Sequence, residues 1–160
     1  MLTPAIVLYD VVLFVHILAV VLAFGVTFAY PLLDAHVRRT NRGDLVALHR
    51  FQVFLTSRLI TPAMVVVLVA GLYLATDRWS LGDPWIGATF AILIVLFGLV
   101  GAVLTPTERR LVELAERDAA AGGEPSADYE REARRYALVG SVSALLVVVA
   151  VFLMTVKPGA

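Results

Sequence analysis

The sequence predicts an all-α integral membrane protein in which four spanning helices form a left-handed antiparallel bundle. Two observations carry this prediction. Sixty per cent of the 160 residues are apolar and 16% are charged, whereas a soluble domain has roughly 45–50% apolar and about 25% charged residues. Lys, Arg, Asp and Glu are also absent from four long stretches, residues 11–33, 59–76, 84–107 and 136–156. A helix needs ~20 mainly apolar residues to cross the ~30 Å hydrocarbon layer, so each stretch is long enough for one span.

A single domain is expected to cover residues 1–160. Its four spans, with their flanking residues, are expected at 8–33, 56–76, 84–106 and 136–156. We interpret the first as a permanent span, because a cleavable signal peptide begins with basic residues and the first Arg here is Arg38.

The basic residues predict the orientation of the chain. Eleven of the 13 Lys and Arg residues fall in two connections, at residues 34–58 and 106–135, and the other two are Arg78 and Lys157. Short loops rich in Lys and Arg stay on the cytoplasmic side of a membrane. The sequence therefore predicts a multi-pass protein of the inner (cytoplasmic) cell membrane with both termini outside (N-out/C-out).

The connection at residues 107–135 predicts a cytoplasmic helical hairpin. The third span is expected to continue as a polar helix until the Gly- and Pro-containing residues 122–125 break it. Ser126 and Asp128 can then cap a helix that runs without a break into the fourth span. Leu111, Leu114 and Ala115 share one side of the first hairpin helix, and the mixed positive and negative charges of the hairpin favour a solvated face over a docking surface.

Several function classes are excluded by what the sequence lacks. With no Cys there is no disulfide, thiolate metal site, thiol nucleophile or covalently attached haem. The net charge is zero, so there is no basic field for nucleic acid. No phosphate-binding Gly loop, H-E-x-x-H or G-x-S-x-G motif occurs. The sequence therefore favours a non-enzymatic protein.

His16 is the first candidate functional residue, because an ionisable side chain inside a span is costly to bury and is often functional. In one interpretation it makes a hydrogen bond between helices. In the other it is an axial ligand to a b-type haem, or binds another metal or relays protons, inside the bundle. Met154 is the better-placed second axial ligand, and a two-fold dimer that pairs two copies of His16 is the alternative. His36 and His49 belong to the cytoplasmic side and are not expected to reach the depth of His16.

Arg58 is the second candidate. At the end of the second span, its side chain is expected to reach the lipid headgroups. Alternatively it pairs with Asp34, or it lies beside carbonyls freed by Pro62 and binds an anionic headgroup or a haem propionate.

Small residues on the last two spans predict close helix packing. Gly98 and Gly101 share a face of the third span, and Gly140, Ser143 and Ala144 share a face of the fourth. Because small residues let helix backbones approach, we expect these faces to meet.

Landmarks along the whole chain carry a family resemblance. In order they are His16 within Leu-Phe-Val-His-Ile-Leu, Gly25, residues 58–64 and 71–74, Trp85, residues 106–111 and 134–140, and the tail 153–158. The chain is similar to bacterial predicted integral membrane proteins of domain-of-unknown-function family 2269. The resemblance implies a four-helix integral membrane protein with no settled activity.

A more distant resemblance is to the four-helix haem-binding protoporphyrinogen oxidase and to copper-resistance D-type membrane domains. These families also place a His early in span one and a Gly after it, here His16 and Gly25, and Pro31 and His36 lie roughly where the oxidase has Pro and His. The Trp and the Arg of the oxidase pattern are absent. What this resemblance implies is haem binding through His16 without the oxidase activity.

The predicted function is therefore a non-enzymatic structural or interaction role in the membrane, with His16 packed between helices. The alternative is a haem b redox protein in which His16, Met154 and Arg58 form the site. Membrane lipids are the expected partners. A homo-oligomer or a membrane-protein partner stays open, and nucleic acid is not expected.

Overall fold

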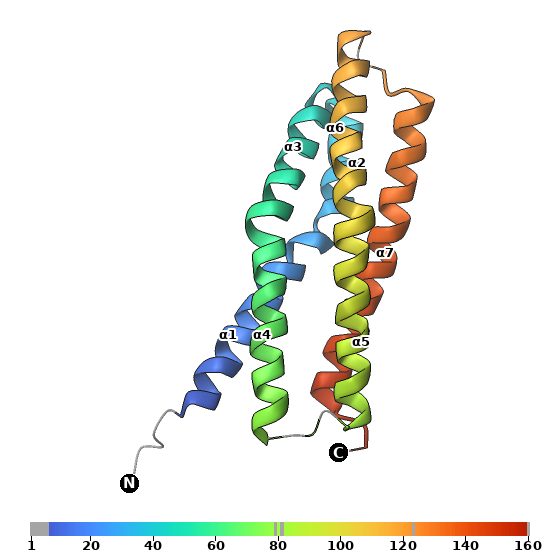
Figure 1. Cartoon of the computed structure of the whole chain (residues 1–160). Coiled ribbons are helices and arrows are strands. Elements are labelled where there is room, and N and C mark those ends of the chain that lie inside the picture. Colours follow the sequence, from blue (N-terminus) through green and yellow to red (C-terminus); the bar gives the residue numbers. More distant parts are fainter. Residues whose placement is uncertain (1–6, 79, 81, 123, 160) are drawn as a thin grey trace.

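The computed structural model describes residues 7–78, 80, 82–122 and 124–159. Over these residues the chain is helical and forms no strand, which confirms the predicted all-α class (Figure 1). The helices are α1 (Leu8–Phe24), α2 (Tyr30–Thr40), α3 (Leu45–Leu55), α4 (Thr61–Arg78), α5 (Pro84–Gly98), α6 (Thr105–Ala120) and α7 (Ala127–Val156). The segments between them are the 3-10 turns η1 (Val26–Phe28) and η2 (Arg42–Asp44) and the π-helical turns η3 (Thr56–Ile60) and η4 (Leu99–Leu104).

These elements join into four long helical rods. The rods cover Leu8–Thr40, Arg42–Asp77, Pro84–Ala120 and Ala127–Val156. Each is long and apolar enough to cross a membrane. The prediction of four candidate spanning helices is therefore confirmed.

Pro62 and Pro106 explain the π-helical turns in the second and third rods. Proline has no N–H and its ring crowds the carbonyl four residues earlier, so it interrupts the α-helical hydrogen bonds. Each π-helical turn ends two residues before the proline, at Ile60 and at Leu104. Spanning helices tolerate proline through such local adjustments, and both rods therefore continue past it.

Two helix pairs make up the apolar part of the bundle. α1 packs along α4 and α5 packs along α7, whereas α4 and α5 contact each other at few residues (Figure 1). At the other end of the molecule, α3 packs on α6 and α6 packs on α7. The space between the two pairs is therefore filled less completely than the space within each pair.

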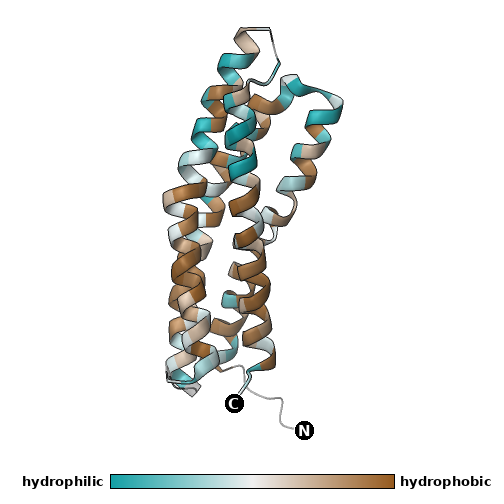
Figure 2. Cartoon of the chain, turned by 90° about the vertical axis from the view of Figure 1, so that its right-hand side faces the viewer, coloured by the Kyte–Doolittle hydropathy of each residue, from teal (hydrophilic) through white to brown (hydrophobic). Residues whose placement is uncertain are grey.

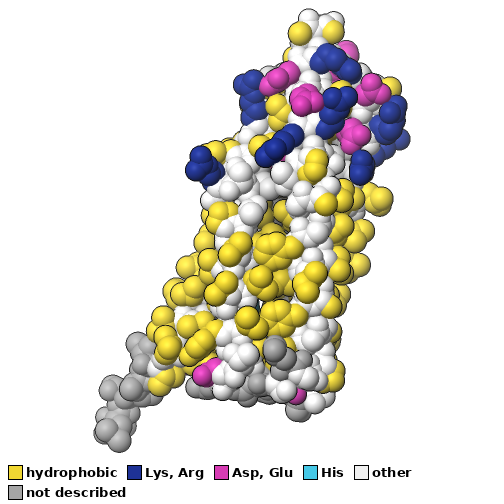
Figure 3. Space-filling view, viewed as in Figure 1, with side chains coloured by type: hydrophobic (Ala, Val, Ile, Leu, Met, Phe, Trp, Pro, Cys, Tyr) yellow, Lys and Arg dark blue, Asp and Glu magenta, His cyan; other side chains and the backbone are white. Residues whose placement is uncertain are grey.

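Polar and apolar residues separate along the bundle. Figure 2 shows the apolar ribbon gathered in the part that contains α1, α4 and α5, and Figure 3 shows the Lys, Arg, Asp and Glu side chains gathered at the opposite end. We name this opposite end, residues 34–55 and 107–135, the charged end. Large apolar side chains elsewhere are exposed, among them Phe14, Val69 and Leu145. A soluble monomer rarely exposes so continuous an apolar surface, which fits a surface that faces lipid.

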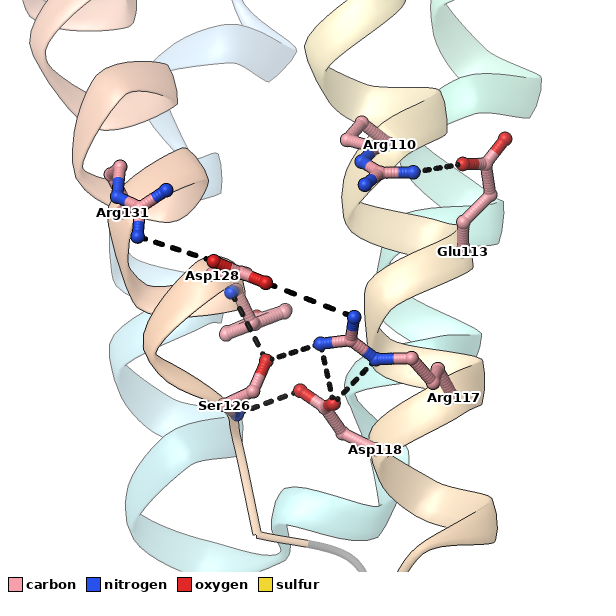
Figure 4. A network of polar contacts seen from close by, with 8 residues as sticks. Arg110, Glu113, Arg117, Asp118, Ser126, Asp128 and Arg131 are labelled. Atoms are coloured by element: carbon pink, nitrogen blue, oxygen red, sulfur yellow. Dashed lines mark hydrogen bonds and ion pairs between the residues drawn. The ribbon is translucent and has the colours of Figure 1, made fainter.

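Side chains at the end of α6 form hydrogen bonds with the start of α7 at the tip of the hairpin (Figure 4). Ser126 caps α7 as predicted, since its Oγ accepts a hydrogen bond from the N–H of Tyr129 at 3.3 Å. Asp118 accepts the backbone N–H of Ser126 at 2.7 Å and is paired with Arg117 at 3.2 Å. Arg117 also donates to the Oγ of Ser126 at 2.8 Å. Burial alone would raise the pKa of Asp118, but the hydrogen bonds from Ser126 and Arg117 outweigh it and hold the pKa below its usual value.

The hairpin is solvated on its outer side only. Leu111, Leu114 and Tyr129 are buried against Leu45 of α3. Ion pairs also join it to the first two rods, and they are Arg38–Glu130, Arg42–Glu124 and Arg50–Glu116. Most charged side chains of the hairpin are exposed, as predicted, but Glu108 and Asp118 are buried, and the apolar side of the hairpin packs on α3.

The predicted small-residue contact between the last two spans is also wrong. Gly98 and Gly101 are exposed, and a Cβ added to either would meet no atom within 4 Å. Leu96 and Val147 belong to one buried cluster instead, so larger side chains fill the interior between α5 and α7. A Cβ added to Gly140 would also meet no atom within 4 Å, and Gly140 lines a cavity.

Candidate functional site

Two cavities lie one behind the other inside the bundle. We name the cavity farther from the charged end the outer cavity and the one nearer the charged end the inner cavity. Their volumes are about 210 Å³ and about 190 Å³. Phe24, Leu96 and Val147 line both cavities, and all three are buried in one apolar cluster. They form an apolar layer that divides the interior into two compartments.

His16 lies between α1 and α4 and lines the outer cavity. Its side chain is 8% exposed, and the ring lies against the backbone of Val67. The ring packs against Gly71 of α4. A Cβ at this position would lie only 3.1 Å from His16 Cε1, so the glycine leaves room for the ring. Among the described residues, His16 Nδ1 has no hydrogen-bond partner. His16 is therefore a tightly packed side chain with one unused polar atom.

The structure brings two of the three predicted site residues together. Met154 of α7 lines the outer cavity with His16, and Lys157 lines it too, its ammonium 5.7 Å from the ring centre of Trp85. Arg58 is exposed on η3 and lines neither cavity.

The suggested pair between Arg58 and Asp34 is wrong. Asp34 pairs with Arg38 of the same helix instead, at 2.6 Å. Residues four apart lie on one face of a helix, so Arg38 reaches the carboxylate within its own helix.

Glu108 is the most deeply buried acidic residue beside the inner cavity. It stands near the start of α6 and is 2% exposed. Its Oε1 accepts hydrogen bonds from Thr56 at 3.1 Å and from the hydroxyl of Tyr136 at 2.7 Å. In the part of the chain that the structure describes, Glu108 Oε2 and the hydroxyl of Tyr30 have no hydrogen-bond partner, and both residues line the cavity.

His49 heads a polar network on the charged side of the same cavity. Its Nδ1–H donates to Oε1 of Gln52 at 2.8 Å, and its Nε2 accepts from the hydroxyl of Tyr129 at 2.7 Å. The oxygen of Tyr129 accepts in turn from Arg38 at 3.4 Å, and Arg38 also pairs with Glu130 at 2.8 Å. Burial lowers the pKa of His49, and the hydrogen bond to Gln52 opposes this only in part. The ring is therefore neutral, with its proton on Nδ1.

The sequence reasoning missed the inner site. His49, Gln52 and Thr56 recur at intervals of three and four residues, so they share one face of a largely apolar helix. Glu108 directly follows an uncharged stretch. Together these two signals could have indicated a polar lining where the second and third spans meet the charged end.

These features define the chain as an integral membrane protein with four spanning helices and an interior that holds polar groups between apolar walls. A family model described as predicted integral membrane protein (DUF2269) matches residues 10–158. The chain belongs to this family. Neither a curated protein nor a solved structure matches the sequence.

Proposed function

We propose that the chain is a non-enzymatic binding protein of the cytoplasmic membrane, with both termini outside, that holds a small molecule inside its bundle. One observation supports this proposal above all. The two cavities lie between helix pairs, and each is lined by a buried residue with an unused polar atom, His16 in the outer cavity and Glu108 in the inner one. A buried polar atom without a partner costs about 1–3 kcal/mol, and a ligand that bonds to it recovers this energy.

The arrangement of titratable groups favours binding over catalysis. His16 and Glu108 line different cavities, and the layer of Phe24, Leu96 and Val147 lies between them. His49 lines the inner cavity with Glu108, but both of its ring nitrogens are engaged in hydrogen bonds. A general acid or base needs a position within hydrogen-bond reach of a substrate proton, and the ring of His49 has none left.

Native mass spectrometry of the protein extracted in mild detergent tests the proposal. A leucine in place of Gly140 would occupy the inner cavity, whereas a leucine in place of Gly98 would extend from the exposed face of α5. We expect a small-molecule adduct on the wild type and on the control Gly98→Leu, and its loss from Gly140→Leu. An unmodified mass for the wild type, or an adduct that Gly140→Leu retains, contradicts binding in this cavity.

Haem is a second candidate, and the observation that favours it is that His16 and Met154 line one cavity. His and Met are an axial pair that haem proteins use, and the group would supply one-electron redox chemistry. The donor atoms of His16 and Met154 suit haem iron, but the outer cavity is too small for a haem. About 210 Å³ is below the roughly 300–1,000 Å³ of sites that hold drug-sized ligands, and Arg58 is not there to meet a propionate.

An absorption spectrum of the purified protein, oxidised and dithionite-reduced, decides this second candidate. A Soret band that His16→Ala removes would establish haem and show that the helix pairs separate to admit it. A wild type that stays colourless after haemin is added excludes haem.

A further inference from the structure

Among the described residues, the carboxyl group of Glu108 has no cation beside it, and burial raises its pKa. A cation bound there would favour the ionised form. The two contacts of the carboxyl group are the hydroxyls of Thr56 and Tyr136, which share Oε1. Among the described residues that line the inner cavity there is no Lys or Arg. The guanidinium of Arg38, in the network of His49, is already bonded to Asp34, Glu130 and Tyr129. Within the part of the chain that the structure describes, no donor is bonded to Oε2, and the hydroxyl of Tyr30, which lines the same cavity, is also unpartnered.

The walls of the cavity select the kind of donor. On the membrane side they are aliphatic, with Ile60, Leu96, Val100 and Leu104. A metal ion such as Ca²⁺ takes six to eight oxygen ligands, and no group of three His, Asp or Glu residues suited to a metal occurs in the described ranges. The cavity therefore suits an organic group with one polar end.

Aromatic rings favour a positive charge on that polar end. Phe24, Phe28, Tyr30 and Tyr136 all line the inner cavity. An ammonium within ~6 Å of a ring face gains about 0.5–2 kcal/mol from the negative face of the ring. Paired with an ionised carboxylate, it also forms a hydrogen bond roughly twice as strong as a neutral one.

The volume and the opening limit the size and the route. A volume of about 190 Å³ is below the roughly 300–1,000 Å³ of sites that hold drug-sized ligands, so the ligand is smaller than those molecules. Four lining residues are exposed on the outside of the bundle, Phe28 and Pro31 of the first rod and Ala137 and Ser141 of α7. The cavity therefore opens sideways between these two rods, next to the charged end, where an amphipathic molecule in the bilayer interface would enter.

We propose that the inner cavity binds a small amphipathic organic amine in its ammonium form, with Glu108 as the counter-ion and the aliphatic wall around its apolar body. This inference rests on the proposed function and names the class of ligand at the inner site.

The probes that test it are benzylamine and the neutral isostere benzyl alcohol, titrated calorimetrically into the protein in nanodiscs with empty nanodiscs subtracted. We expect the wild type to bind the amine at least tenfold more tightly than the alcohol, a comparison that needs no variant. Glu108→Gln keeps the shape and removes the charge, so it should weaken the amine at least tenfold and leave the alcohol unchanged. Gly140→Leu should abolish both signals, and the control Gly98→Leu should change neither.

The outcomes separate the two proposals. Equal binding of amine and alcohol that Gly140→Leu abolishes would overturn the amine and leave a cavity that binds small molecules. Amine binding that Glu108→Gln leaves intact overturns the role of Glu108 as counter-ion. No binding of either probe means that the cavity holds water only, and binding that Gly140→Leu does not alter lies outside the cavity. Either result contradicts the proposed function at this cavity as well.

Discussion

The hydroxyl of Tyr129 donates a 2.7 Å hydrogen bond to Nε2 of His49, across 80 residues of sequence. The two side chains are 0% and 2% exposed, and they join α7 to α3 at the charged end. The guanidinium of Arg38 lies 5.2 Å from the ring centre of Tyr129 and donates to the same hydroxyl oxygen. One tyrosine hydroxyl therefore connects the first, second and fourth rods beside the inner cavity.

Replacing Tyr129 with Phe should destabilise the protein by about 1–3 kcal/mol, because His49 Nε2 would be left buried without a donor. Thermal unfolding in detergent, followed by circular dichroism, measures the loss. Tyr73→Phe is the matched control, since among the described residues the hydroxyl of Tyr73 makes no hydrogen bond. Equal melting temperatures for the two variants would show that the bond between His49 and Tyr129 adds nothing to stability.

The buried neutral state of His49 predicts that stability falls in mild acid. Its pKa in the folded protein is below the ordinary 6.5, because burial disfavours the charged ring and Arg38 adds repulsion. Below about pH 6.5 the unfolded chain binds the proton first, so the free energy of unfolding decreases as the pH falls towards the lowered folded-state value.

Unfolding curves measured between about pH 7.5 and 5.5 test this dependence. His49→Gln should flatten the slope over this range, because it removes one group whose protonation differs between the folded and unfolded states. His36→Gln, at an exposed position of α2, is the control and should keep the wild-type slope. A slope unchanged by His49→Gln would assign the acid sensitivity to other groups.

Asp118 should hold the hairpin tip closed. Asp118→Ala removes the acceptor of the Ser126 N–H at 2.7 Å and the partner of Arg117 (Figure 4). We expect a local loss of about 1–3 kcal/mol, seen as roughly tenfold or faster hydrogen exchange at the amides of Ser126 and Tyr129.

The neighbouring pair of Arg110 and Glu113 provides the control for the tip. Its side chains are 56% and 64% exposed, and exposed ion pairs contribute about 0–1 kcal/mol. Glu113→Ala should therefore leave exchange at the tip unchanged. Because the pKa of Asp118 is lowered, its contribution should persist above about pH 4 and disappear as the pH falls through the lowered value.

The sequence predicts the four spans and the hairpin well because length, charge and Gly–Pro signals are local properties. It does not predict which face of a helix turns inward, because that depends on how the helices pair. The sequence therefore predicts an interface at Gly98 and Gly101, whereas in the structure both residues are exposed. Glu108 lies within residues 107–135, where the sequence predicts a solvated face, because nothing local shows that the hydroxyls of Thr56 and Tyr136 converge on it.

The contact between His16 and Gly71 gives the most direct test of His16 as a packing residue. A Cβ at position 71 would lie 3.1 Å from His16 Cε1 and 3.5 Å from Nδ1. The imidazole or the backbone of α4 must then move, and such overpacking costs about 1–3 kcal/mol. Gly71→Ala should lower stability by that amount in the wild type and by much less in a His16→Ala background, where the crowded ring is absent. A double-mutant cycle isolates this coupling, and Gly101→Ala, which meets no atom within 4 Å, should show none. Additive effects of Gly71→Ala and His16→Ala would mean that the ring does not occupy the space above the glycine.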